Sequence, residues 1–516
     1  MIEYLDLLMF ATLMVAVLSG FPVAFSIAGT AIIFAFLGWY LGAMNISLLG
    51  AMSQRIFGLL TNGVLIAIPL FVLMGAVLEK SRIAEDMLDT MGRSFGQLRG
   101  GLGISVVLVG TLLAASTGIV GATVVAMGMI ALPTMLRSGY SPRLAAGVVC
   151  ASGTLGQIIP PSTLLIILSD VVSNSFQQAQ YEQGKFAIET ISVGQVFAAA
   201  LLPGLAIVGL YILYLLIRGL IRPDDMPVLK DVGPHPSLPS TLSAILPALL
   251  LILAVLGAIL SGIASPTEAA SVGGLGAILM AAIKSGANRK LLLTGAVCLL
   301  LLAVAAGIYP VRMQRSDLNT TDYLIGGVYI LLTLVAIVAI VLAVKALIAS
   351  KTLQPALTST LTMTSMIFAT ILAAGVFSLV FVGLGGDDRV HNILNELPGG
   401  PTAALVFCML FIFVLGFFLD FVEITVIVLP LVMPALILMG HDPVWLAVLI
   451  AINLQTSFLT PPFGFSLFYL RGVAPKKVTT WHIYAGVAPF ILLQIVAIGV
   501  IWFVPSLATY LPKVLF

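Results

Sequence analysis

Long apolar stretches, bounded by charged residues or by glycine and proline, alternate with short polar connections along almost the whole chain. A helix that crosses a bilayer needs about 20 consecutive, mostly apolar residues. The pattern therefore predicts an all-α polytopic membrane protein whose main solvent is the lipid bilayer. The expected ordinary spans lie near residues 4–20, 22–43, 62–79, 194–217, 241–263, 266–283, 291–309, 323–347, 360–383 and 484–511.

Composition excludes several other classes of protein. Of the 516 residues, 60% are hydrophobic and only 9% are charged, whereas a soluble domain carries about 25% charged residues. A soluble enzyme and a disordered chain are therefore ruled out, and a net charge of +2 is too balanced for a nucleic-acid-binding surface. The three cysteines and four histidines are scattered, without the spacing of a disulfide framework or a metal site.

Four regions do not resemble simple spans, because a polar, glycine-rich or Pro-Pro segment interrupts each of them. The regions are 102–136, 142–172, 401–439 and 443–470. The interruptions are Ser116–Thr123, Gly156–Thr163, Leu419–Thr425 and Thr460–Gly464. Non-helical backbone at membrane depth is tolerated only where protein buries it or where it lines a cavity. These interruptions are therefore the expected places for function.

The chain contains an internal repeat, since residues 133–162 align without a gap on residues 434–463 after a shift of 301 positions. The matched positions include Pro133 with Pro434, Gly139 with Gly440, Pro142 with Pro443, and Pro160–Pro161 with Pro461–Pro462. Proline and glycine fix backbone shape, so the repeat predicts a recurring geometry of a hairpin followed by a broken helix. Paired broken helices in two halves of a chain point to the binding site of a transporter. The pattern leaves open whether the two halves are inverted.

A helix break exposes carbonyl groups, which suit a small cation such as Na⁺, and a half-helix N-terminus, which favours an anion. Hydroxyl and amide side chains accompany the breaks in both halves. In the first half they are Ser116, Thr117, Thr123, Thr154 and Ser162, and in the second half Thr425, Asn453, Gln455, Thr456, Ser457 and Thr460. Each of them could instead bond its own backbone or a neighbouring helix. Their clustering at both repeat copies favours a shared ion and substrate site.

Two carboxylates, Asp420 and Glu423, lie three residues apart within an apolar stretch that has no basic residue nearby. This spacing places them on one helix face. Carboxylates inside a membrane are rare and usually functional. The alternative is that they lie near an aqueous end of the hairpin and only solvate it.

The motifs around the four interruptions resemble those of one family. ASTGIVGATVVAMGMIALPTMLRSGYSPRLAAGVVCASGTLGQIIPPS and LGFFLDFVEITVIVLP are similar to the large membrane subunit of the tripartite ATP-independent periplasmic (TRAP) transporters. LQTSFLTPPFGFSLFYLRGVAP resembles a subgroup labelled for mannitol or chloroaromatic compounds. The resemblance implies an elevator-type secondary transporter with two inverted repeats, each with a re-entrant helical hairpin and a broken helix.

It also implies a protein of the bacterial inner membrane that imports an organic acid on a Na⁺ gradient, without ATP or a cofactor. A soluble periplasmic binding protein would deliver the substrate, and a small four-helix membrane subunit would complete the transporter. In the first half the implied site adds Gly118, Gly121, Gly153, Gly156, Pro160 and Pro161 to the side chains named above, and in the second half Pro461, Pro462 and Gly464. The first hairpin departs from the usual Ser-Gly-Ser-Ser-like motif, because this chain has Ser116-Thr117-Gly118-Ile119.

These observations predict seven segments. They are 1–101 (N-terminal scaffold helices and an interfacial helix), 102–172 (first hairpin and broken helix), 173–283 (connector and scaffold helices), 284–354 (an insertion with two extra spans), 355–400 (a scaffold helix), 401–470 (second hairpin and broken helix) and 471–516 (a C-terminal helix). The interfacial helix is expected at 85–99, whose amphipathic pattern also fits an ordinary connecting helix. The insertion has an even number of spans, so it preserves the orientation of the second half.

Three other functions compete with this interpretation. A carrier that works without a binding protein would use the same broken helices. A proton-translocating respiratory subunit needs a chain of Lys, Glu and His across the membrane, which the long spans lack. A channel is less well supported, because paired unwound helices fit alternating access better than a continuous pore.

Overall fold

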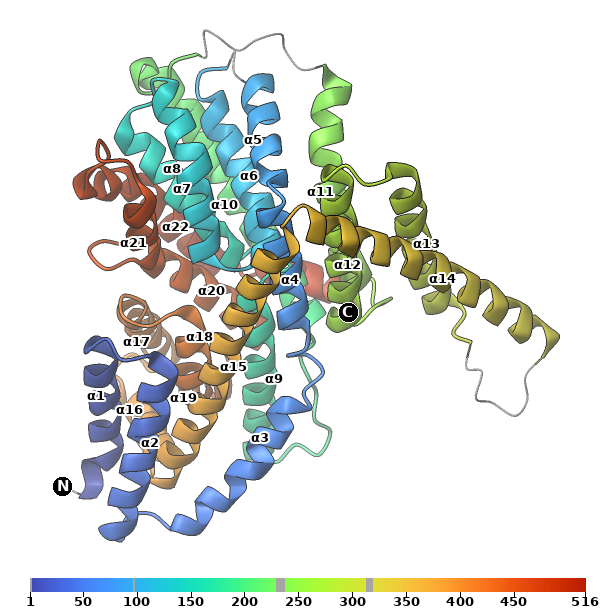
Figure 1. The fold of residues 1–516 in the computed structure, drawn as a ribbon. Coiled ribbons are helices and arrows are strands. Elements are labelled where there is room, and N and C mark those ends of the chain that lie inside the picture. Colours follow the sequence, from blue (N-terminus) through green and yellow to red (C-terminus); the bar gives the residue numbers. More distant parts are fainter. Residues whose placement is uncertain (1, 96–97, 229–236, 312–318) are drawn as a thin grey trace.

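The computed structural model describes residues 2–95, 98–228, 237–311 and 319–516, and every regular element among them is a helix (Figure 1). Ten of the described helices are long and apolar enough to cross a membrane, which confirms an all-α polytopic membrane protein. Outside the two repeated units, the helices are α1 (Leu5–Leu18), α2 (Val23–Tyr40), α3 (Met52–Leu60), α4 (Ala67–Lys80), α5 (Ile83–Ser94), α10 (Val193–Ile221), α11 (Leu238–Leu260), α12 (Pro266–Lys284), α13 (Arg289–Ile308), α14 (Thr320–Ala349), α15 (Leu353–Gly383), α16 (Gly386–Glu396), α22 (Thr480–Phe503) and α23 (Ser506–Leu515).

Two predicted spans differ from the structure for local reasons, and the span expected at 360–383 begins earlier, at Leu353. The span expected at 62–79 begins only at Ala67, because the Asn62 side chain accepts a hydrogen bond from the Val64 N–H (3.0 Å) and holds a turn there. The span expected at 484–511 is divided into α22 and α23 around Pro505, which caps the second helix. Helix α5 (Ile83–Ser94) covers the first part of the amphipathic segment expected at 85–99, and its apolar stripe is buried in contact with α6 and α11.

The two repeated units have the same order of elements. In the first, α6 (Gly101–Thr117) and α7 (Val120–Arg137) form hairpin 1, and α8 (Pro142–Thr154) continues through a 3₁₀ turn into α9 (Thr163–Glu182). In the second, α17 (Gly400–Leu415) pairs with α18 (Phe421–Glu423), a π-helical turn (Ile424–Val428) and α19 (Leu429–Leu438) to form hairpin 2. Broken helix 2 consists of α20 (Pro443–Leu459) and α21 (Phe465–Val473), separated by Thr460–Gly464.

The repeat is also visible in local backbone geometry. Each hairpin ends at a glycine with positive φ, 82° at Gly139 and 94° at Gly440, a conformation that favours glycine. Two residues later, Ser141 and Asp442 cap the next helix, since each side chain accepts a hydrogen bond from a backbone N–H of the first turn. The offset of 301 residues therefore coincides with a repeated hairpin end and helix start.

The two units pack crosswise into one body. Hairpin 2 packs through α19 against α9, and hairpin 1 packs through α7 against α21. At the second contact, a Cβ on Gly128 would lie only 2.7 Å from Val473. At the contact of α8 with α22, a Cβ on Gly147 would lie 2.1 Å from the Gly486 carbonyl oxygen. Glycine is required at these positions because the backbones approach so closely.

The α7–α8 and α10–α11 connections lie at the upper end of the bundle in Figure 1, whereas the α4–α5 connection lies lower, beside the tip of hairpin 1. The end of α12 is held to α5 by the Lys284–Asp86 ion pair (2.6 Å). The α3–α4, α9–α10 and α11–α12 connections lie close together, and there the Thr267 hydroxyl donates to the Gly63 carbonyl (2.6 Å).

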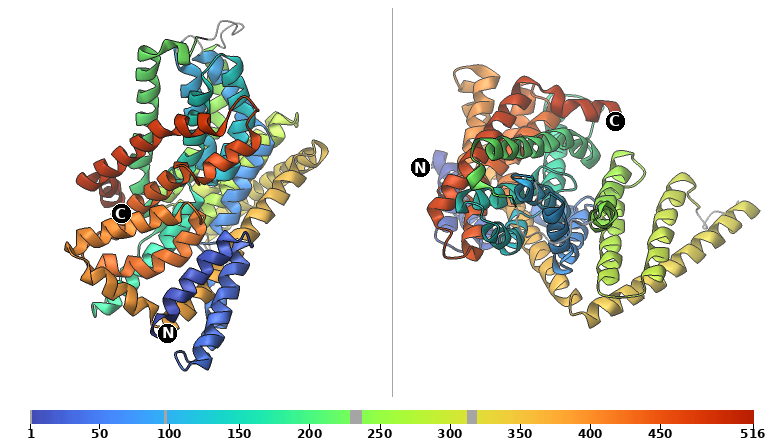
Figure 2. Two further views of the ribbon diagram at one scale, coloured as in Figure 1. Left: turned by 90° about the vertical axis from the view of Figure 1, so that its left-hand side faces the viewer. Right: turned by 90° about the horizontal axis from the view of Figure 1, so that it is seen from above.

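Helices α13 and α14 form an arm that projects from the body (Figures 1 and 2). They pack tightly on each other, because a Cβ on Gly295 would lie 2.2 Å from the Ala339 Cβ. The arm joins the rest of the molecule mainly through α12. It corresponds to the two extra spans expected within 284–354.

Candidate substrate and ion site

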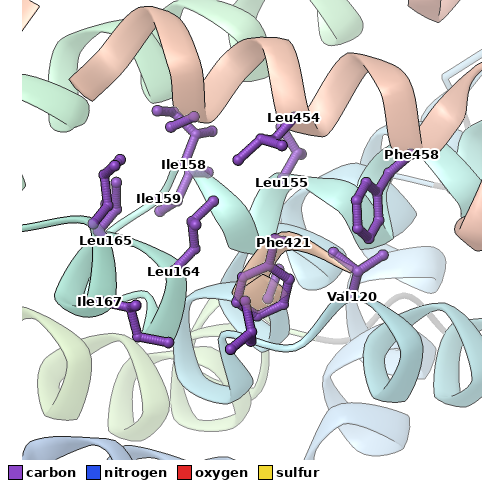
Figure 3. Packing of buried hydrophobic residues seen from close by; sticks show 14 of the residues in the cluster. Val120, Leu155, Ile158, Ile159, Leu164, Leu165, Ile167, Phe421, Leu454 and Phe458 are labelled. Carbon is purple, nitrogen blue, oxygen red and sulfur yellow. The ribbon is translucent and has the colours of Figure 1, made fainter. Parts of the chain in front are cut away.

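Both hairpin tips and the second break border one cavity of about 340 Å³. Val120 comes from hairpin 1, Phe421 from hairpin 2, and Phe458 and Tyr469 from the two parts of broken helix 2, while α4 and α15 complete the wall. Figure 3 shows Val120, Phe421 and Phe458 converging beside Leu155 of the first break. The fold thus brings together elements of both repeat copies.

The charged groups of this cavity are unbalanced. Lys80 forms an ion pair with the neighbouring Glu79 (2.8 Å). Among the described lining residues, this leaves the carboxylate of Asp420 without a basic partner. Asp420 accepts a hydrogen bond from the Phe421 N–H (2.8 Å), and its own N–H donates to Glu423, which is buried (2.8 Å). Both carboxylates are thereby fixed at the N-terminus of α18, with net negative charge beside the cavity.

In the first half, the tip of hairpin 1 lies directly against the break. Gly118, in the left-handed conformation (φ 62°), has no room for a side chain, because a Cβ there would lie 2.6 Å from the Thr163 hydroxyl oxygen. A Cβ on Gly156 would likewise lie 2.8 Å from the Ala114 carbonyl oxygen. The Thr163 hydroxyl is fully buried and has no hydrogen-bond partner among the described residues. A free hydroxyl beside helix-end carbonyls suits a small cation.

In the second half, hairpin 2 meets its broken helix in a similar way. A Cβ on Gly416, at the end of α17, would lie 2.1 Å from the Ser457 hydroxyl oxygen. The Asn453 side chain donates a hydrogen bond to the Met409 carbonyl in α17 (2.7 Å). Asn453 therefore holds α20 to the hairpin.

Most of the hydroxyls predicted from the sequence bond backbone carbonyls of their own helix. This is the arrangement of Thr123, Thr154, Thr425, Thr456, Ser457 and Thr460, with oxygen–oxygen distances of 2.6–3.0 Å. Ser162 instead spans the first break, since its hydroxyl donates to the Gln157 carbonyl (3.0 Å). The side chains of Ser116 and Thr117, at the end of α6, lie outside the described residues.

The remaining predicted residues shape the backbone. Gly121, Gly153 and Gly464 are close-contact positions, where a Cβ would lie 2.9 Å from the Tyr469 ring, 2.4 Å from Val124 and 2.6 Å from the Phe458 carbonyl oxygen. Pro160–Pro161 and Pro461–Pro462 occupy the two breaks, with a cis peptide bond in each pair. Gln455 contacts its repeat-related residue Thr154 across the two halves (3.5 Å).

Some site residues were missed by reasoning from the sequence. Thr163 directly follows the Pro-Pro-Ser motif, and nothing in the sequence separates its hydroxyl from the bonded ones. A second cavity, of about 390 Å³, lies toward the opposite end of α4 and α15 and is lined in part by Arg55, Asn62 and Asp170. Asp170, which accepts a hydrogen bond from Asn62 (2.9 Å), could have been noticed as a carboxylate within an apolar stretch.

Comparison with known proteins gives consistent matches. The family described as "Tripartite ATP-independent periplasmic transporter, DctM component" matches residues 10–311 and 290–507. The C4-dicarboxylate TRAP transporter large permease protein DctM of Vibrio cholerae is 28% identical, over 98% of this chain and 97% of that protein. The ectoine TRAP transporter large permease protein TeaC of Halomonas elongata is 24% identical, over 99% of each chain. The crystal structure of the YdaH transporter of Alcanivorax borkumensis has a similar fold, with a TM-score of 0.54 and 15% identity over 89% of each chain.

Proposed function

Because the chain belongs to the family of the DctM component of tripartite ATP-independent periplasmic transporters, we propose that it is the large permease subunit of a Na⁺-coupled importer of an organic acid. It is a multi-pass protein of the bacterial inner membrane. Its partners would be a soluble periplasmic binding protein and a small four-helix membrane subunit. The two relatives described above are named for different solutes, so the proposal extends to an organic acid and not to one compound.

The observation that carries this proposal is the unpaired carboxylate of Asp420 in the cavity between the hairpin tips. An organic anion that enters this cavity is repelled by the fixed negative charge of Asp420. This repulsion is strong where water is excluded. A cation bound first at the hairpin tips offsets that charge. The acid then docks near the half-helix N-termini, which favour anions. Electrostatics therefore favours the binding of Na⁺ before the binding of the acid.

The proposed movement is an elevator motion of two inverted repeats. The cavity between the tips includes Glu79 and Lys80 at the C-terminal end of α4, and the second cavity includes Asn62 near its other end. Two cavities toward opposite faces of the membrane support alternating access. The hairpins and broken helices would carry the solute from one to the other.

Transport by the reconstituted subunits tests this function. Proteoliposomes with both membrane subunits are supplied with the binding protein and labelled organic acids, beginning with succinate as a C4-dicarboxylate probe. Uptake is expected to fall to background when external Na⁺ is replaced by K⁺ or choline. Unchanged uptake would contradict the coupling of transport to Na⁺. Uptake that persists without the binding protein would instead identify a stand-alone carrier.

A further inference from the structure

Four polar side chains from four helices meet in the interior of the molecule. Thr154 lies at the end of α8, Tyr211 in α10, Gln455 in α20 and Gln494 in α22, and all four are fully buried. The Gln494 amide donates a hydrogen bond to the Tyr211 hydroxyl (2.7 Å), and the Gln455 amide donates to the Thr154 hydroxyl (3.5 Å). The Tyr211 hydroxyl also interacts with Gln455 and Thr154. We refer to these four residues as the axial cluster.

The axial cluster lies where the two copies of the repeat contact each other. Thr154 and Gln455 are 301 positions apart, the offset that relates the two halves. Repeat-related residues that contact each other must lie near the pseudo-symmetry axis of the two halves. Their contact is therefore a direct side-chain link between one half and the other.

Each end of this link is close to a helix break. Thr154 is the last residue of α8, directly before the turn that opens the first break. Gln455 lies about one turn before Thr460, where the second break begins. A cation that draws the carbonyls of one break inward shifts the adjacent side chain, and the hydrogen bond transmits this shift to the other break.

The cluster is not fully satisfied, because the amide oxygens of Gln455 and Gln494 are buried without a partner among the described residues. Thr154 has a second arrangement open to it, since its hydroxyl donates to the Ala151 carbonyl (2.9 Å) and could turn toward the Gln455 oxygen. Binding events at the two helix breaks could each favour one of the two hydrogen-bonding arrangements of this buried network, and a shared two-state element of this kind can couple two sites.

We propose that each helix break holds one Na⁺ and that the axial cluster couples these two sites, so that binding at one break favours binding at the other. The proposal rests on the Na⁺-coupled function given above. Its four members are positioning residues, which act on the ions through the breaks. Coupling between sites is typically 5–150-fold, and a coupling of about tenfold would make the two ions bind cooperatively.

A Na⁺ titration of the purified complex of both membrane subunits tests the coupling without a known solute. Binding is followed by tryptophan fluorescence, with NaCl exchanged for choline chloride at constant ionic strength. The wild type is expected to give a Hill coefficient of about 1.5, the value for two equivalent sites coupled about tenfold. Gln455→Leu should fold, because it removes an unsatisfied buried amide, and should lower the coefficient to about 1. The half-saturating Na⁺ concentration should rise only about threefold, the square root of a tenfold coupling shared by two sites.

Thr154→Val and Gln494→Leu should have the same effect on the Hill coefficient, and Gln455→Leu added to Thr154→Val should lower it no further. Thr111→Val is the matched control, since this buried hydroxyl bonds the Val107 carbonyl of its own helix (2.7 Å) and no other group among the described residues. A variant that weakens Na⁺ binding but keeps the wild-type coefficient would overturn the coupling and leave the transport function standing. A wild-type complex that does not respond to Na⁺ would overturn the proposed function itself.

Discussion

At the scale of single residues, one free hydroxyl distinguishes the first break. Thr163 faces Gly118 at the tip of hairpin 1 and is buried without a hydrogen-bond partner among the described residues. A buried polar group that lacks a partner costs about 1–3 kcal/mol. A bound cation would offset this cost, so we expect the Thr163 hydroxyl to be a direct Na⁺ ligand.

Thr163→Val keeps the shape of the side chain and removes the oxygen. The half-saturating Na⁺ concentration for transport is expected to rise about tenfold, which corresponds to about 1.4 kcal/mol. Na⁺-dependent uptake in proteoliposomes measures it, with Thr111→Val as the control. Equal Na⁺ affinity in Thr163→Val and wild type would exclude this hydroxyl as a ligand.

Asn453 acts differently, because its amide holds α20 to hairpin 2 through the Met409 carbonyl. Asn453→Leu removes this hydrogen bond between the two helices and lets the hairpin separate from the broken helix. One lost hydrogen bond costs about 1 kcal/mol, so uptake is expected to fall about fivefold. Cys150→Ala, a buried change in α8, should reduce uptake much less. If both variants transport equally well, this contact has no role in transport.

The sequence predicted the regions of the site better than its individual ligands. Pro-Pro pairs and the repeat identify the breaks, because these residues fix the backbone wherever they occur. Whether a hydroxyl is free depends on packing between distant segments. Thr456 bonds its own helix (2.7 Å), whereas Thr163 has no partner among the described residues. Nothing within a few residues of either threonine distinguishes the two.

At the scale of elements, the N-terminus of α18 combines a structural and an electrostatic role. Asp420 caps this short helix and also supplies the unpaired charge of the cavity. Asparagine caps helices about as well as aspartate. The two roles can therefore be separated by one substitution.

Asp420→Asn should preserve hairpin 2 and remove the negative charge. Na⁺ affinity is then expected to fall about tenfold, a change of about 1.4 kcal/mol, while the thermal stability of the complex stays near that of the wild type. Asp442→Asn is the matched control, because Asp442 caps α20 in the same way (2.8 Å) and does not line the cavity between the tips. Equal losses of Na⁺ affinity in the two variants would contradict an electrostatic role for Asp420.

Element boundaries show what hydropathy alone misses. The apolar windows predicted α10, α12 and α13 closely, because long apolar stretches have few alternatives in a membrane. They placed the start of α4 too early and joined α22 to α23, because the Asn62 turn and Pro505 act through local backbone geometry. The sequence could not show whether the apolar stripe of α5 faces protein or lipid, since an amphipathic helix can cover either.

At the scale of the whole molecule, the arm of α13 and α14 is the feature least connected to the site. Both helices are largely exposed in the chain alone and meet the body mainly through α12. We expect the arm to widen the fixed scaffold or to contact the small membrane subunit.

Deletion of residues 288–348 removes an even number of spans, so the second half should keep its orientation. The deletion is expected to weaken co-purification of the small subunit, while the large subunit still elutes as a single species in gel filtration. Intact co-purification together with intact transport would show that the arm has neither role.

One helix, α15, forms a wall common to both cavities. Met363 borders the cavity between the hairpin tips, and Gly375 borders the second cavity. With a rise of 1.5 Å per residue, the helix between them measures roughly 18 Å. In the proposed transport cycle, a solute that passes from one cavity to the other would travel about this far along a single helix. We therefore expect that one extra helical turn inserted between Met363 and Gly375 would lengthen the path of the solute.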